Sequence, residues 1–137
     1  MHTVKAYLGF IVTYLVIDAV WILTVVRPLY YRDLSHLLAE SPDMLAAIIF
    51  YLAYPFGVVI FVIKPAVSKV NVLTLGSLFG LITYGTYTLT NYALLKGWTV
   101  TILLSDAAWG AFITSVSAFA GYLAANYKIS SEKAFSD

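Results

Sequence analysis

The chain has 137 residues, of which 61% are hydrophobic and 11% are charged. A soluble domain carries about 25% charged residues, so this composition predicts an integral membrane protein. The formal net charge of +1 indicates no nucleic-acid partner, and the absence of cysteine excludes disulfides and cysteine-ligated metals. Continuous apolar runs favour membrane helices over the short alternating strands of a β-barrel.

The first apolar run predicts a membrane span over about residues 7–26. It follows a short basic start, as a signal peptide would, but it is long and has no small-x-small cleavage pattern, so we predict that it is retained. Residues 27–40 then form the longest loop. Leu34, Leu37 and Leu38 fall at helical spacing there, which fits a short interfacial helix and a plain polar loop about equally well.

Three further spans are predicted over about residues 42–63, 72–95 and 99–125. The predicted fold class is therefore an all-α, polytopic four-transmembrane-helix bundle that forms a single domain over residues 1–137. The polar tail from Lys128 onward is expected to be loosely ordered.

The expected helix ends carry recognisable signals. Ser41 is predicted to cap the second span, with Pro42 in its first turn. Asn71 is predicted to cap the third span, which Lys96 and Gly97 terminate.

Four spans place both termini on one side of the membrane. That side carries five cationic side chains and the other side carries three, and by the positive-inside rule this difference predicts cytoplasmic termini. The first group is Lys5, Lys64, Lys69, Lys128 and Lys133, and the second is Arg27, Arg32 and Lys96.

Two aspartates interrupt the apolar runs, Asp18 in the first span and Asp106 in the fourth. Counting about 1.5 Å per residue from the expected helix ends, both lie at a similar depth, in the half of the membrane away from the termini. Trp21 and Trp109 each follow an aspartate by three positions, which puts each pair on one helix face. The repeated Asp-Ala-x-Trp is compatible with an inverted repeat or with coincidence, because the rest of the two spans does not match.

The two middle spans contribute polar side chains to the same layer. Pro55 in the second span cannot donate a backbone hydrogen bond, so a bend with a freed carbonyl is expected there. The candidate site residues of these spans are Tyr51, Tyr54, Tyr84, Tyr87, Thr90 and Asn91, of which Tyr84, Tyr87 and Asn91 share one face.

Each of these residues also has a structural interpretation. A charged side chain at the membrane centre costs at least ~2.5 kcal/mol on insertion scales, so a functional role is favoured for Asp18 and Asp106 over an interhelical hydrogen bond. If the two carboxyl groups are neighbours, they can share a proton, as a relay or an acid/base pair would require. The aromatic residues fit an interfacial belt equally well. Gly76 and Gly80 form a GxxxG packing pattern.

Several site types lack the residues they need. No histidine lies within a predicted span, so an axial haem ligand or a histidine-rich diiron site has no source. Two aspartates are too few for a conventional metal site, and no Gly-x-Ser-x-Gly motif is present. We therefore predict no metal and no cofactor, and the sequence leaves open whether the protein is an enzyme.

The polar layer carries a family resemblance. The pattern resembles a bacterial family of predicted membrane proteins known only as domain of unknown function 2177. This resemblance implies a compact four-span protein of the bacterial inner membrane and brings no activity, substrate or cofactor. It spans about Asp18 to Gly110, and the residues that carry it are Asp18, Trp21, Phe50, Tyr51, Tyr54, Gly57, Tyr84, Thr86, Tyr87, Leu89, Thr90, Asn91, Ala93, Trp98, Asp106, Trp109 and Gly110.

Three functions are compatible with this layer. The leading hypothesis is a pocket for a small molecule or lipid, open toward the outer half of the bilayer, in which the aspartates anchor polar groups and the aromatic residues form a wall. Acids beside aromatic rings also suit cations. The alternatives are a small proton-coupled transporter that acts as a homodimer, and a structural or assembly subunit in which Gly76 and Gly80 pack against a partner.

Overall fold

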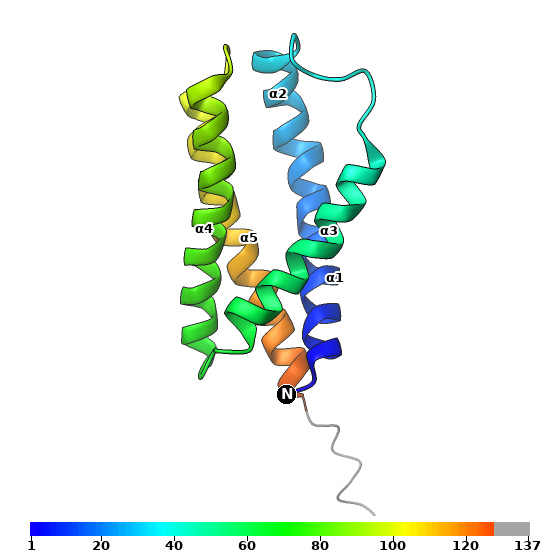
Figure 1. Ribbon diagram of the computed structural model, residues 1–137, viewed down its shortest axis with the longest axis vertical. Coiled ribbons are helices and arrows are strands. Elements are labelled where there is room, and N and C mark those ends of the chain that lie inside the picture. Colours follow the sequence, from blue (N-terminus) through cyan, green and yellow to red (C-terminus); the bar gives the residue numbers. More distant parts are fainter. Residues whose placement is uncertain (128–137) are drawn as a thin grey trace, which may run out of the picture.

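The computed structural model describes residues 1–127, and all the regular elements within them are helices. Four helical runs are long and apolar enough to cross a membrane: Thr3–Leu34, Met44–Ile63, Lys69–Leu94 and Val100–Asn126. The predicted fold class is therefore confirmed. In Figure 1 the N-terminus and the last turn of α5 lie at one end of the bundle, here called the terminal end. The opposite end, which carries the α4–α5 turn, is called the loop end.

The first run is longer than the sequence predicted. It consists of α1 (Thr3–Trp21), a π-helical segment η1 (Ile22–Val26) and α2 (Arg27–Leu34). The prediction that the span ends at residue 26 is wrong, because the helix continues to Leu34. Of the three leucines that suggested a separate interfacial helix, only Leu34 lies in α2, whereas Leu37 and Leu38 follow its end. The extension is stabilised by tertiary packing, since Leu34 is buried against Trp98 and Ile102 at the loop end.

The second run contains α3 (Met44–Val58) and a second π-helical segment, η2 (Val59–Ile63). Asp43 caps it, accepting a hydrogen bond from the backbone N–H of Ala46 at 3.1 Å. The predicted cap, Ser41, precedes the helix, because an acid suits the positive helix end and Asp43 lies closer to the apolar run. Helix α3 continues through Pro55, which has no N–H to donate to the carbonyl of Tyr51, and π hydrogen bonding begins at Val59. The bend expected at Pro55 stays a prediction.

The remaining helices, α4 (Lys69–Leu94) and α5 (Val100–Asn126), form an antiparallel hairpin. Ser68 caps α4 by accepting a hydrogen bond from the N–H of Asn71 at 3.1 Å. The prediction that Asn71 is the cap is wrong, because Asn71 lies inside the helix. Thr99 caps α5. Gly97 adopts φ +90° in the turn, a conformation that glycine tolerates and that ends α4 as predicted.

Glycines set the contact between α4 and α5. A Cβ added at Gly76 would lie 2.8 Å from Ser115 Cα, and one added at Gly80 would overlap the carbonyl of Gly110. The GxxxG pattern thus pairs with α5 of the same chain. The expectation that an assembly subunit would use these glycines against a partner is wrong, because α5 already covers them.

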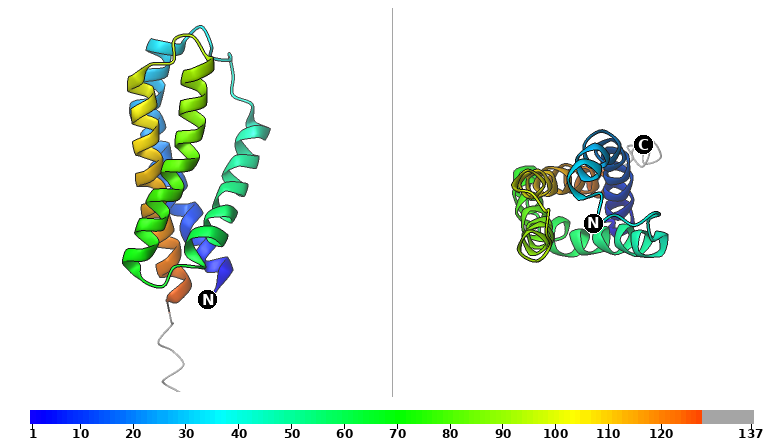
Figure 2. Two further views of the ribbon diagram at one scale, coloured as in Figure 1. Left: turned by 60° about the vertical axis from the view of Figure 1, so that its left-hand side comes forward. Right: turned by 90° about the horizontal axis from the view of Figure 1, so that it is seen from above.

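Helix α3 is the least integrated of the four. The α4–α5 pair and the α1–α5 pair share the most extensive contacts, whereas α3 leans on α1 and reaches α4 and α5 mainly through η2. The Tyr7 hydroxyl donates to the carbonyl of Leu52 at 2.9 Å and ties α3 to α1. In Figure 2 the two helices α3 and α4 diverge toward the loop end. The groove between them is the structural feature that positions the candidate site.

Candidate functional site

Asp18 joins three helices through its carboxylate. The Tyr51 hydroxyl on α3 donates to Oδ2 at 2.7 Å, and the Trp109 indole N–H on α5 donates to Oδ1 at 3.1 Å. Only 6% of the Asp18 surface is exposed, and these two hydrogen bonds give each carboxylate oxygen a donor inside the protein. This arrangement requires α1 and α5 to be neighbours, which the sequence alone left open.

Asp106 lies on α5 and has a different environment. Its Oδ2 accepts a hydrogen bond from the Tyr30 hydroxyl on α2 at 2.5 Å, and its surface is also 6% exposed. Within residues 1–127 no other hydrogen bond reaches this carboxylate, so Oδ1 has no donor. Asp106 therefore has one free acceptor where Asp18 has none.

The two carboxylates form separate centres. No hydrogen bond joins them in the described part of the chain, and each has its own tyrosine donor. The rings of Trp21 and Trp109 stack beside Asp18, with centroids 4.2 Å apart and planes 4° apart. The structure therefore gives no support to the hypothesis that the two aspartates share a proton.

The π-helical segment η1 explains how Tyr30 reaches Asp106. In a regular α-helix, at about 100° per residue, Tyr30 would face about 120° away from Asp18. A π turn accommodates one extra residue, which rotates the following helix back by about 100°. Tyr30 and Leu34 thereby face the bundle, as Asp18 does, and Tyr30 meets α5.

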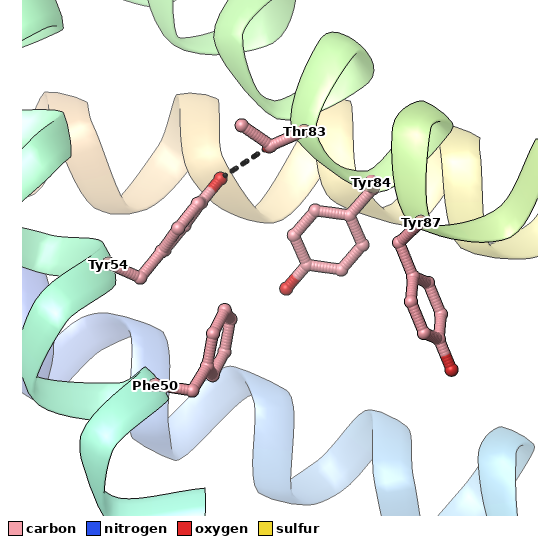
Figure 3. Close-up of a pocket in the computed structure, with 5 residues that line it drawn as sticks. All are labelled: Phe50, Tyr54, Thr83, Tyr84 and Tyr87. Carbon is pink, nitrogen blue, oxygen red and sulfur yellow. Dashed lines mark hydrogen bonds between the residues drawn. The ribbon is translucent and has the colours of Figure 1, made fainter. Parts of the chain in front are cut away.

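A cavity of about 390 Å³ opens between α3 and α4. Figure 3 shows its aromatic wall, with Phe50 and Tyr54 projecting from α3 toward the tyrosines of α4. None of the lining side chains carries a charge, so the cavity suits an apolar or amphiphilic molecule. The lining residues are Phe50, Tyr54, Thr83, Tyr84 and Tyr87.

The tyrosine hydroxyls at the base of the cavity are bonded within the protein. Tyr54 shares its hydroxyl with Thr114 on α5 at 2.7 Å and with Thr83 on α4 at 3.1 Å. The hydroxyl of Tyr84 pairs with that of Tyr14, which is fully buried on α1. These bonds fix the ring orientations that shape the cavity.

The model of a family described as a predicted membrane protein, DUF2177, matches residues 3–123. The chain belongs to this family. Its description carries no activity, which agrees with the resemblance found in the sequence. No curated protein matches the chain, and no solved structure matches it either.

In this DUF2177 chain most of the predicted site residues lie in three places. Asp18, Tyr51, Trp109 and Trp21 form one group, and Tyr54, Tyr84 and Tyr87 line the cavity. Asp106 lies apart with Tyr30. Thr90 is exposed and Asn91 is half-buried, and neither belongs to the cavity lining.

Two hydrogen-bonding tyrosines of this DUF2177 protein are not among the predicted site residues. Tyr30, in the segment predicted as a loop, bonds to Asp106, and Tyr14, in the first predicted span, bonds to Tyr84. Tyr14 precedes Asp18 by four positions, so helical spacing alone places it on the aspartate's face. Tyr30 gave no such signal, because the π turn changes the spacing. In residues 1–127 no three acidic, histidine or cysteine side chains gather as a metal site would require.

Proposed function

We propose that the protein binds a lipid or a small lipid-soluble molecule in the cavity between α3 and α4. The observation that carries the proposal is the cavity itself, about 390 Å³ between two helices long enough to cross a membrane. Pockets for small ligands typically have volumes of about 300–1,000 Å³ and largely apolar walls with a few polar groups. The aromatic lining and the hydroxyl groups of this cavity meet that description.

Ligand entry from the bilayer is supported by the loose attachment of α3. Phe50 and Tyr87, on opposite walls, are 42% and 49% exposed. Helices α3 and α4 make little direct contact, so the acyl tail of a lipid can enter the cavity sideways from the bilayer.

The aspartate layer supplies polar anchoring in this proposal. Asp18 holds Tyr51 and Trp109 and so fixes the distance of α3 from α1 and α5, which sets the width of the cavity. Asp106 offers its free oxygen to a polar group. Thr90 and Asn91, farther along α4, are proposed to orient a polar head.

We place the protein in the bacterial inner membrane with both termini in the cytoplasm and the cavity in the outer half. The support is the charge distribution: Lys5, Lys64 and Lys69 lie at the terminal end, and Arg32 and Lys96 lie toward the loop end. Lys128, Lys133 and the polar tail fall outside the described residues.

Native mass spectrometry of the gently extracted protein tests the proposal. Wild type should retain a molecule of defined mass, and Phe50→Ala should lose most of it. Phe56→Ala is the matched control, because Phe56 is an exposed phenylalanine of the same helix that is not part of the cavity lining. A bare protein in every sample, or equal retention in both variants, would contradict the proposal.

A proton-coupled transporter acting as a homodimer is a second candidate. It is favoured by one observation, the buried Asp106 carboxylate, which has no cationic partner among residues 1–127. Transport predicts substrate uptake into proteoliposomes that depends on a pH gradient and is lost in Asp106→Asn. A binding protein needs no such coupling.

A further inference from the structure

The free oxygen of Asp106 points to a second, polar subsite beside the cavity. We infer that Asp106 Oδ1 binds an ammonium group carried on an apolar tail, so that the ligand is a cationic amphiphile. The inference rests on the proposed function, since the tail would occupy the α3–α4 cavity, and it adds the charge of the ligand's head.

The carboxylate lacks the partners that a buried acid needs. Its only hydrogen bond within residues 1–127 comes from Tyr30, a neutral group. The one ion pair in that part of the chain joins Arg32 and Asp33 and does not reach Asp106. A buried acid without a cation is costly in a membrane, and a bound ammonium group would supply the missing charge.

The free oxygen is also accessible. Among the described residues, only Ser117 Oγ is a side-chain polar atom that is both fully enclosed and without a hydrogen-bond partner. Asp106 Oδ1 also has no partner, so it is not fully enclosed and keeps some accessible surface. An oxygen that is nearly buried, unpaired and still reachable is suited to a ligand.

Aromatic rings surround this subsite. Tyr30 and Tyr87 each meet Trp98 edge-on, with ring centroids 5.7 Å apart in both pairs. Tyr30 bonds to Asp106, and Tyr87 also lines the cavity, so one aromatic cluster extends from the acid to the groove. In Figure 3 the Tyr87 ring projects away from α4, with its hydroxyl directed away from Tyr54. An acid beside tyrosine and tryptophan rings is the usual recognition chemistry for ammonium groups.

Helix α4 leaves space at the same level. Gly80 lies against Gly110, so Gly85 comes near the level of Asp106 in the antiparallel α5. A Cβ added at Gly85 would meet no atom within 4 Å, although Gly85 itself is buried. The cavity next to this space has uncharged, mostly aromatic walls, so a cation that carries an apolar tail fits it better than a free cation does.

A pair of probes with the same tail tests the inference. The full chain in nanodiscs of phosphatidylcholine is titrated with decyltrimethylammonium and with decanol, and partition into empty nanodiscs is subtracted. Wild type should bind the ammonium probe about tenfold more tightly than the alcohol, and Asp106→Asn should reduce that ratio to about one, as expected for loss of a buried charge partner. Glu40→Gln, which removes the same charge from an exposed position, should keep the ratio.

The ammonium subsite and the cavity can fail separately in this experiment. Equal binding of both probes by wild type would overturn the ammonium subsite while leaving the cavity as a binding site. Binding of neither probe would overturn both. If Asp106→Asn does not fold, Asp106→Glu keeps the charge and the wild-type ratio remains decisive. A ratio that survives in a folded Asp106→Asn would also overturn the inference.

Discussion

Tyr30 and Asp106 lie 76 positions apart in the sequence, and their oxygen atoms are 2.5 Å apart in the structure. The bond joins α2 to α5 toward the loop end, beyond the point where a π turn resets the helix face. Asp106 therefore has one carboxylate oxygen without a donor among the described residues, whereas both oxygens of Asp18 have donors.

Removing the Tyr30 hydroxyl should weaken the loop end. Tyr30→Phe leaves Asp106 without a donor, and we expect the free energy of unfolding to fall by about 1 kcal/mol. Unfolding in mixed micelles, followed by circular dichroism, measures the change. Tyr31→Phe is the control, because the neighbouring Tyr31 is exposed and makes no side-chain hydrogen bond among the described residues. Equal losses of unfolding free energy in Tyr30→Phe and Tyr31→Phe would contradict the hydrogen bond between Tyr30 and Asp106.

Replacing Asp18 should cost more than replacing Asp106. Asp18→Asn leaves one oxygen for two donors, so either the Tyr51 hydroxyl or the Trp109 N–H loses its partner, at about 1–3 kcal/mol. Asp106→Asn keeps the acceptor that Tyr30 uses and should be milder. A double-mutant cycle of Asp18→Asn with Tyr51→Phe should show a coupling energy. Strict additivity would show that the hydrogen bond contributes nothing to stability.

Two glycines of α4 should respond oppositely to alanine. Gly80→Ala forces a methyl group into the Gly110 carbonyl and should destabilise the α4–α5 hairpin by about 2 kcal/mol or more. Gly85→Ala has open space and should be neutral or stabilising by up to about 1 kcal/mol, because alanine favours the helix. Thermal unfolding in the same detergent compares them. If Gly85→Ala destabilises the protein as much as Gly80→Ala does, the open space beside Gly85 does not exist.

The π turn makes one deletion tolerable. Deleting Leu23 removes the extra residue of η1 and leaves a regular helix in which Tyr30 still faces Asp106. Deleting Val16 from the regular part of α1 rotates its two halves by about 100° and should prevent folding. Both residues are exposed to a similar extent, so loss of packing does not distinguish them. The yield of monodisperse protein reports the result, and equal yields would contradict the role of η1.

The four helices could be predicted because each is a long apolar run with a capping residue nearby, and the fold class is confirmed. The caps themselves were displaced by two or three positions at Asp43 and Ser68, since several polar residues near each start compete for the role. The end of the first helix was missed because packing of Leu34 on Trp98, a contact distant in sequence, holds it.

The candidate site was predictable as a layer but not as a set of contacts. Helical spacing placed Asp18 with Trp21 and Asp106 with Trp109, and depth placed the tyrosines beside them. The hydrogen-bond partners of the two aspartates depend on which helices are neighbours. Sequence periodicity does not show which helices are neighbours. Tyr51 therefore appeared near both acids, whereas the structure gives it to Asp18 and gives Tyr30 to Asp106.

A lipid with a photoreactive diazirine on its acyl tail shows directly whether the α3–α4 cavity holds an apolar tail from the membrane. The protein is labelled in its native membrane, digested and mapped by mass spectrometry. We expect labelling concentrated at Phe50, Tyr54, Tyr84 and Tyr87, well above that at Val12, Val20 and Phe56, which are exposed and are not part of the cavity lining. Labelling spread evenly over all exposed apolar positions would contradict it.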